Sequence, residues 1–130
     1  MKNRITVFLL LLIPQLSIAQ LTLTIEVNEL QNSDGQIFLE LSNEQEIKVA
    51  GVTKNISKNS CIIVIENLKP GNYAFKFFHD ENKNSKLDVN WMGIPKEGFG
   101  FSNNPKMTFG PLSFEKTIFN LNESIVKKCK

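Results

Sequence analysis

Apolar and polar residues alternate without a break over residues 21–28, which read LTLTIEVN. Successive side chains of a β-strand point to opposite faces, so this period of two predicts a strand with one buried and one solvated face. A second alternating run places Ile37, Leu39 and Leu41 on one face, and the turn-forming residues 32–35 separate the two runs. We expect the two runs to pair as a first hairpin.

Three further runs predict strands in the middle of the chain. Residues 48–52 predict a short edge strand, and the β-branched run 61–65 predicts a strand that is buried on both faces. Residues 73–77 alternate again, with the aromatic side chains on one face. Pro70 and Gly71 stand just before this run and suit the centre of a type II turn, because proline presets φ and glycine accepts a positive φ.

Two short runs near the end of the sequence, 116–121 and 124–129, complete the set of predicted strands. No segment shows a sustained helical period, and no internal repeat is visible. Short strands joined by turn signals, in a chain of this length, are typical of two packed sheets. We therefore expect an all-β fold, a single antiparallel β-sandwich of about seven strands.

The N-terminal segment 1–19 has the layout of a secretory signal peptide. Lys2 and Arg4 supply positive charge, an apolar run follows at 7–13, and the small residues Ser17 and Ala19 stand at the two positions that determine cleavage. The alternative is an uncleaved membrane anchor, but the run is too short for a helix that crosses a hydrocarbon core of ~30 Å. We therefore predict a secreted or periplasmic protein.

Cleavage would leave residues 20–130 as one β-sandwich domain that does not span a membrane. The whole chain has 15 basic and 13 acidic residues, and two of the basic ones lie in the predicted signal peptide. The exported domain is therefore formally neutral. Proteins that bind nucleic acid usually carry a basic stripe, and none is visible here, so we do not expect nucleic acid as a partner.

Cys61 and Cys129 are the two cysteines of the chain. Outside the cytoplasm they can form a disulfide, which would close a long loop and stabilise the fold by ~4 kcal/mol. In the alternative interpretation, Cys61 is a buried small hydrophobe and Cys129 lies in a frayed terminus. Spacing in the sequence cannot decide between the two.

The segment 80–88 carries oxygen-bearing groups at alternate positions, as the calcium loops of EF-hands do. Two positions depart from that pattern: Ser85 stands where a glycine makes the sharp turn, and Trp91 stands where an acid closes the shell. Glu97 could supply the missing acid. The predicted calcium ligands are the side chains of Asp80, Asn82, Asn84 and Asp88 and the backbone carbonyl of Lys86.

Calcium bound to this loop would be held weakly, with a dissociation constant of ~10⁻⁴–10⁻³ M. Lys83 and Lys86 dilute the negative charge of the loop. The alternative is a solvated turn in which Asp and Asn side chains bond their own backbone. His79, the one histidine, is not predicted to bind zinc, because no second histidine exists and both cysteines are distant in sequence.

Residues 91–114 form a long stretch rich in glycine, proline and aromatic residues. A loop of this length in a compact domain is functional or disordered, and its aromatic content argues against disorder. One interpretation is a ligand platform, and the other is that the aromatics cap one end of the core while the asparagines form turns. The platform would consist of Trp91, Phe99 and Phe101 as flat surfaces and Glu97, Asn103 and Asn104 as polar contacts.

Four segments resemble, in order, a bacterial family of secreted proteins known as domain of unknown function 2141. They are LKPGNYA at 68–74, HDENKNSKLD at 79–88, GIPKEGFGFSNN at 93–104 and GPLSF at 110–114. The resemblance implies a small exported β-sandwich of the transthyretin-like, prealbumin type, without an established activity. The family's loop usually reads DENxNGKLD, and Ser85 takes the place of its glycine here.

Catalysis is not expected, because no converging set of reactive groups is visible. His79 and Asp80 are neighbours on a strand, so their side chains should point to opposite faces, and Cys61 lies in an apolar run that disfavours a thiolate. We predict an exported non-catalytic module, stabilised by calcium, that is a binding or structural component of the cell envelope. Its partner would be a protein, a glycan or an envelope component. The alternative is a small carbohydrate-active or other hydrolase that uses Asp80, Asp88 and Glu97.

Overall fold

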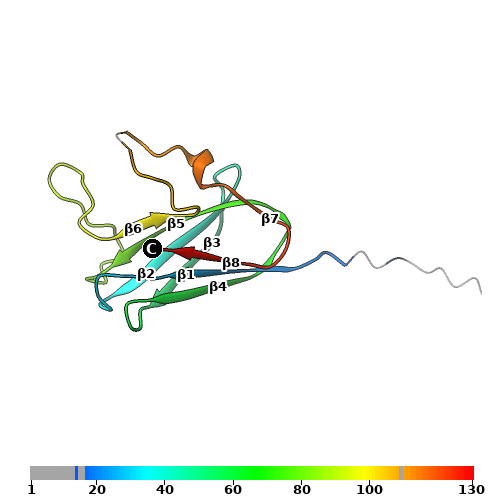
Figure 1. The fold of residues 1–130 in the computed structure, drawn as a ribbon, viewed down its shortest axis with the longest axis horizontal. Helices are drawn as coiled ribbons and strands as arrows, with labels where there is room; N and C mark the ends of the chain where they lie inside the picture. The colour runs from blue at the N-terminus through cyan, green and yellow to red at the C-terminus, as the bar shows by residue number, and fades with distance from the viewer. Residues whose placement is uncertain (1–13, 15–16, 109) are drawn as a thin grey trace, which may run out of the picture.

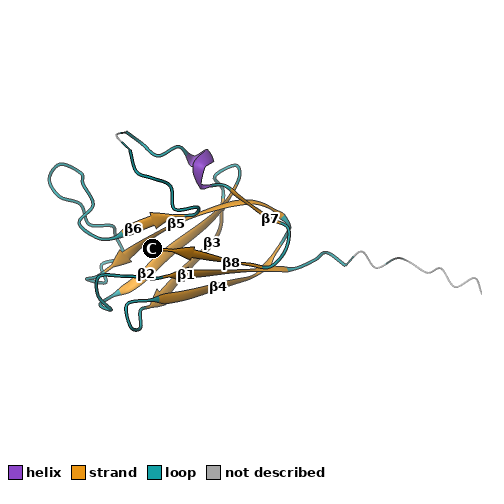
Figure 2. Ribbon diagram, viewed as in Figure 1, coloured by secondary structure: helices purple, strands orange, loops and turns teal. Residues whose placement is uncertain are grey.

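The computed structural model describes residue 14 and residues 17–108 and 110–130. Most of the predicted signal peptide, 1–19, lies outside these described residues. The described chain is all-β, with eight strands and one short 3₁₀ helix, η1 (Phe114–Thr117) (Figures 1 and 2). None of its helical segments has the length and apolar character needed to cross a membrane.

The smaller of two sheets contains three strands in the order β4-β1-β8. Its members are β1 (Leu21–Val27), β4 (Cys61–Leu68) and β8 (Ile125–Cys129). The central strand β1 runs antiparallel to β4 and parallel to β8. The first and last strands of the described chain therefore lie side by side (Figure 1).

The larger sheet contains five strands, four of them in the order β3-β2-β5-β6. They are β2 (Gln36–Asn43), β3 (Lys48–Asn55), β5 (Gly71–Asp80) and β6 (Phe99–Phe101). The fifth strand, β7 (Phe119–Leu121), also pairs with β5. The long strand β5 therefore organises this sheet, and its C-terminal end leads into the loop that was predicted to bind calcium.

The two sheets pack face to face around one hydrophobic core. Inward-facing residues of both sheets form a single buried cluster. Leu23 and Ile25 from β1 and Ile37 and Leu41 from β2 are completely buried. The alternation read from the sequence therefore identified the buried face of both strands correctly.

The predicted first hairpin does not form, because β1 and β2 belong to different sheets. The two strands face the same core from opposite sides, and burial of one face is enough to produce the alternating pattern in each of them. The pattern identifies the buried face of a strand, but it does not specify the partner strand. The count of about seven strands and the purely antiparallel arrangement also need correction, since the described residues form eight strands and the β1–β8 pair is parallel.

The structure corrects two further predictions, the burial of one strand and the type of one turn, and it confirms one edge strand. Strand β4 is not buried on both faces: Ile62 and Val64 are 54% and 51% exposed, because no described residue covers them on the outer face of the smaller sheet. Gly71 is absent from the described glycines with positive φ, so no type II turn forms there; the chain instead crosses between sheets. The edge strand expected at 48–52 is present as β3, which extends to Asn55.

Candidate functional site

Asp80 ends β5 and holds the start of the following loop. Its carboxylate is completely buried; Oδ1 accepts the amide N–H of Asn84 (3.1 Å) and Oδ2 that of Ser85 (2.9 Å). A buried carboxylate is costly unless hydrogen bonds compensate for lost hydration, and these two bonds do so. Ser85 adopts a φ of 65°, the left-handed conformation that glycine takes more easily. The sharp turn therefore persists without a glycine.

Asp88 is held by the side-chain amides of two asparagines. Asn82 Nδ2 lies 2.6 Å from Oδ2 of Asp88, and Asn84 Nδ2 lies 2.8 Å from Oδ1 and 3.0 Å from Oδ2. The amide oxygens of Asn82 and Asn84 accept the backbone N–H groups of Asn84 (3.2 Å) and Lys86 (2.9 Å). Side chains of the loop therefore bond to one another and to its backbone, which is the arrangement of the alternative interpretation, a solvated turn.

Glu97 joins both ends of the same loop from outside it. Its side chain is only 8% exposed; Oε1 accepts the N–H of Glu81 (3.0 Å) and Oε2 that of Asp88 (3.1 Å). Within the described part of the chain, no group of three or more His, Cys, Asp or Glu side chains is arranged to hold a metal ion. The carboxylate of Glu97 therefore bonds to backbone N–H groups of the loop.

His79 fixes the neighbouring segments to the end of β5. Its ring is 2% exposed, and Nε2 contacts the carbonyl oxygen of Asp34. Since a carbonyl can only accept, Nε2 carries the proton and donates it to this bond. The backbone N–H of His79 donates to the carbonyl of Gly98 (2.7 Å). His79 therefore ties two segments to β5.

The aromatic residues of the predicted platform separate into two places. Trp91 is 91% exposed and lies in the loop between β5 and β6, so it does not cap the core. Phe99 and Phe101 lie on β6, with ring centroids 6.0 Å apart in an edge-to-face arrangement. Glu97 is buried against the loop, away from solvent. Of these four residues, only Phe99 and Phe101 share a surface.

The two asparagines of the predicted platform bond to backbone carbonyls instead. Asn103 Nδ2 donates to the carbonyls of Lys116 (3.2 Å) and Ile118 (2.9 Å), and Asn104 Nδ2 donates to that of Lys128 (2.9 Å). Both asparagines have positive φ, at 68° and 44°. They hold the chain that leaves β6 against the C-terminal part of the fold.

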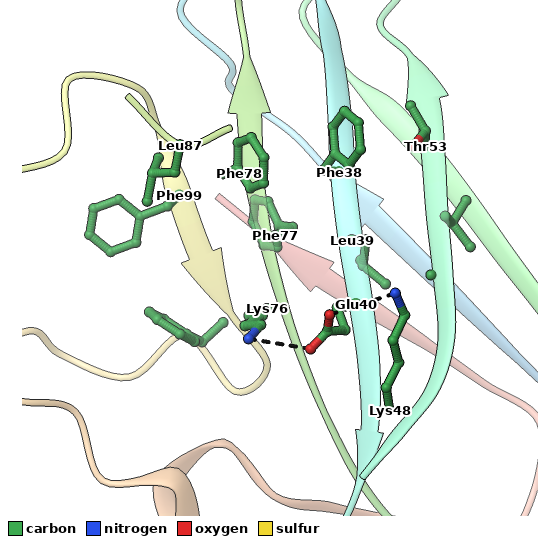
Figure 3. A pocket seen from close by; sticks show the side chains of 13 residues that line it. Phe38, Leu39, Glu40, Lys48, Thr53, Lys76, Phe77, Phe78, Leu87 and Phe99 are labelled. Atoms are coloured by element: carbon green, nitrogen blue, oxygen red, sulfur yellow. Dashed lines mark ion pairs between the residues drawn. The ribbon is translucent and has the colours of Figure 1, made fainter. Parts of the chain in front are cut away.

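An apolar row crosses the outer face of the larger sheet. Strand register aligns Thr53, Phe38, Phe78 and Phe99 across β3, β2, β5 and β6. The rings of Phe38 and Phe78 stack with centroids 5.3 Å apart and planes inclined by 9° (Figure 3). Because these side chains face away from the core, their apolar surface is open to a ligand.

A charged row lies beside the apolar one. Register aligns Gly51, Glu40, Lys76 and Phe101 across the same four strands. Glu40 pairs with Lys76 (3.3 Å) and with Lys48 (3.8 Å), as the dashed lines in Figure 3 show. The row therefore offers two ammonium groups and one carboxylate.

The two rows line a groove of about 540 Å³ on the outer face of the larger sheet. This volume is within the range of small-molecule sites. Leu87, from the loop after β5, also lines the groove, so the loop contributes to its wall. Sequence reasoning missed Phe38 and Phe78. The available signal was that both occupy the face of an alternating strand where polar residues are expected.

Cys61 and Cys129 are both free and buried, so the disulfide, one of the two interpretations of the sequence, is not formed. Val27 of β1 pairs with Cys61 on one side and with Cys129 on the other. The cysteines are thus two strand spacings apart, ~9.5 Å, whereas a disulfide needs Cα atoms within ~7 Å. Burial raises the pKa of the Cys61 thiol, and it raises that of Cys129 to about 11. Cys129 ends a paired strand and does not lie in a frayed terminus.

Comparison with known proteins gives one match. A family model described as "Uncharacterized protein conserved in bacteria (DUF2141)" matches residues 25–128. No curated protein and no solved structure matches the chain significantly. The matched region contains the loop after β5 and all the residues that line the groove. The chain therefore belongs to this family of uncharacterized bacterial proteins.

Proposed function

We propose that this protein is an exported, non-catalytic binding module of the cell envelope. Its ligand has an apolar body and an anionic group, as an acyl chain or an apolar peptide segment with a carboxylate has. The observation that carries the proposal is the groove on the outer face of the larger sheet, where a row of aromatic side chains lies beside two lysines.

The aromatic row supports an apolar ligand body. Phe38 and Phe78 are half-buried and Phe99 is 39% exposed, so all three keep apolar surface in contact with water. Covering apolar surface gains ~25 cal/mol per Å². A ligand that lies along this row therefore recovers free energy that the fold itself leaves unused. The small number of polar groups around the aromatic row makes a glycan a poorer match.

The charged row supports an anionic group on the ligand. Glu40 neutralises one of the two ammonium groups beside it, which leaves one positive charge in excess. Exposed ion pairs contribute only ~0–1 kcal/mol, so either lysine can leave Glu40 for a ligand at little cost. Electrostatics at this end of the groove therefore favour an anion.

The positions of the carboxylates support a non-catalytic role. Asp80 and Glu97 are buried, and each receives two backbone N–H bonds. The carboxylate of Asp88 accepts hydrogen bonds from the side-chain amides of Asn82 and Asn84. A general acid or base must be within hydrogen-bond reach of its substrate, and these three carboxylates are occupied by bonds to the loop. These bonds give the three residues of the alternative hydrolase a role in holding the loop.

For the fold, we propose a β-sandwich of the transthyretin-like type. Two packed sheets around a single core support the sandwich. The family resemblance supports the transthyretin-like arrangement.

Binding of 1-anilinonaphthalene-8-sulfonate, which has apolar rings and one sulfonate, tests the groove. We expect saturable fluorescence enhancement in the native protein. Replacing Phe38 with alanine removes the centre of the aromatic row and should weaken binding ~10-fold, the equivalent of ~1.4 kcal/mol. Replacing Lys76 with glutamine should weaken it less, because one lysine remains.

The matched control is Val64→Ala, which shortens an exposed apolar side chain on the outer face of the other sheet. It should leave dye binding unchanged, and thermal melts should show that all variants are folded. Equal losses in Phe38→Ala and Val64→Ala would contradict binding at the groove. The same holds for a native protein that does not bind the dye.

We also propose that Ca²⁺ binds weakly at the loop after β5. The carboxylate oxygens of Asp80 and Asp88 and the amide oxygens of the two asparagines suit a hard cation. In the structure, the amide nitrogens of Asn82 and Asn84 bond to Asp88. Calcium must replace those bonds, which agrees with a dissociation constant of ~10⁻⁴–10⁻³ M. In EDTA-treated protein, millimolar Ca²⁺ should raise the Tm and release or absorb heat in calorimetry.

Asp88→Asn should remove this calcium-dependent rise in Tm. Glu123→Gln, which neutralises an exposed acid distant in sequence from the loop, should retain it. No heat and no change in Tm at millimolar calcium would rule out the calcium proposal and leave the groove proposal unaffected.

A further inference from the structure

Four large apolar side chains are exposed together in residues 89–94, which we name the tip. Val89 is 49% exposed, Trp91 91%, Met92 58% and Ile94 53%. The tip belongs to the loop between β5 and β6, which projects away from both sheets (Figure 1). Single exposed apolar residues are ordinary, but a contiguous group on a projecting loop marks an interaction surface.

The tip is separate from the features described above. Its side chains are not among the residues of the core cluster, and they do not line the groove. At its base, Val89 forms a β-bridge with Pro95, and the N–H of Lys96 donates to the carbonyl of Asp88 (2.8 Å). The tip is therefore a small hairpin with an ordered base.

Four backbone N–H groups of the tip donate to acceptors within it. The carbonyl of Asn90 accepts the N–H of Gly93 (2.9 Å), and the N–H of Asn90 donates to the carbonyl of Ile94 (2.8 Å). Asn90 Oδ1 accepts the N–H groups of Met92 (2.9 Å) and Ile94 (3.0 Å). Backbone groups bonded in this way can leave water at a reduced cost, which is a requirement for entry into an apolar phase.

The positive and negative side chains of the loop that carries the tip differ in their exposure to solvent. Lys83, Lys86 and Lys96 are exposed. The carboxylates of Asp80 and Glu97 are buried and bonded to backbone N–H groups. The two remaining acids of the loop, Glu81 and Asp88, are half-buried. The loop that carries the tip therefore exposes three ammonium groups, whereas its four carboxylates are buried or half-buried.

We propose that the tip docks on an anionic lipid surface. Trp91, Met92 and Ile94 enter the interfacial layer, and the three exposed lysines lie against lipid phosphates. Tryptophan is favoured at this depth, because its ring is apolar and its N–H is polar. Basic residues beside an apolar anchor are attracted by the negative surface potential of a membrane. The docking is peripheral, and it does not depend on the groove.

The chain offers its own reporter for this proposal, because Trp91 is its only tryptophan. Vesicles of phosphatidylcholine with phosphatidylglycerol are added to the full chain. We expect the emission of Trp91 to shift to shorter wavelength and to be quenched by lipids brominated on their acyl chains. Vesicles of phosphatidylcholine alone should produce a smaller effect. Quenching reports the depth of Trp91 itself, so binding through the apolar segment 7–13 does not imitate it.

Variants that keep Trp91 separate the two contributions. Met92→Ser together with Ile94→Ser should weaken vesicle binding ~10-fold, since two exposed apolar anchors are lost. Replacing Lys83, Lys86 and Lys96 with glutamine should reduce binding to the anionic vesicles to the level seen with phosphatidylcholine alone.

The matched control is Ile62→Ser together with Val64→Ser, which removes two apolar side chains of similar exposure from the smaller sheet. This pair should bind vesicles as the native chain does. Emission that stays unshifted with both kinds of vesicle overturns the proposal and leaves a protein as the partner of the tip. Equal losses in the control pair and the tip pair overturn it as well.

Discussion

Replacing Gly35 with alanine is expected to lower the free energy of unfolding by about 3–4 kcal/mol. Gly35 has a φ of +70°, and a Cβ at this position would lie 1.9 Å from the carbonyl oxygen of Asp80 and 2.7 Å from Cα of Glu81. Both contacts are with backbone, which cannot move aside as a flexible side chain can. Urea denaturation monitored by circular dichroism measures the loss.

Gly93→Ala is the matched control for this prediction. Gly93 has a similar φ of +77°, but a Cβ there meets nothing within 4 Å. The free energy of unfolding of this variant should therefore fall only by the cost of the left-handed conformation for alanine, about 1–2 kcal/mol. If the two variants are equally destabilised, the close approach of Gly35 to the end of β5 is not important for stability.

Replacing Asp80 with alanine is the second change with a large expected effect, a loss of about 2–4 kcal/mol. The variant leaves the N–H of Ser85 without its acceptor, beside the position where the carboxylate was buried. The N–H of Asn84 loses the closer of its two acceptors and keeps Oδ1 of Asn82 (3.2 Å). Unfolding by urea gives the free energy. Amide hydrogen exchange should become faster at Ser85, which loses its bond, and to a smaller extent at Asn84, which keeps its bond to Asn82.

Asp88→Ala provides the comparison within the same loop. The amides that Asp88 binds belong to the exposed Asn82 and Asn84, which can turn to water when the carboxylate is removed. We expect a loss of at most about 1 kcal/mol. A cost for Asp80→Ala that does not exceed this value would argue against Asp80 as the main anchor of the loop.

Much of the fold could be predicted from the sequence, because burial leaves a direct mark on it. The alternation in 21–28 and the edge strand at 48–52 both correspond to observed strands. Pairing left no such mark. β1 and β2 show the same period of two whether they pair with each other or face each other across a core. The run 61–65 was misread because exposed Ile62 and Val64 look like core residues in a sequence.

The loop after β5 was recognised from the spacing of its oxygen-bearing residues, but its internal bonding was not. The sequence contains Ser85 and Glu97, but it does not show that Ser85 accepts a positive φ or that Glu97 bonds to two backbone N–H groups. The groove was missed because it depends on register. Phe38 and Phe78 become neighbours only when β2 and β5 pair, and the two strands are separated by two others in the chain.

The parallel pairing of β1 with β8 has a consequence for how the chain folds. The N–H of Thr22 donates to Oγ of Ser124 (2.9 Å) across 102 residues of sequence. Contacts this distant in sequence close only after most of the chain has been ordered, and topologies that depend on them fold slowly. The smaller sheet cannot be completed before β8 is available. A partly synthesised chain therefore lacks one edge of the smaller sheet and leaves β1 without its parallel partner.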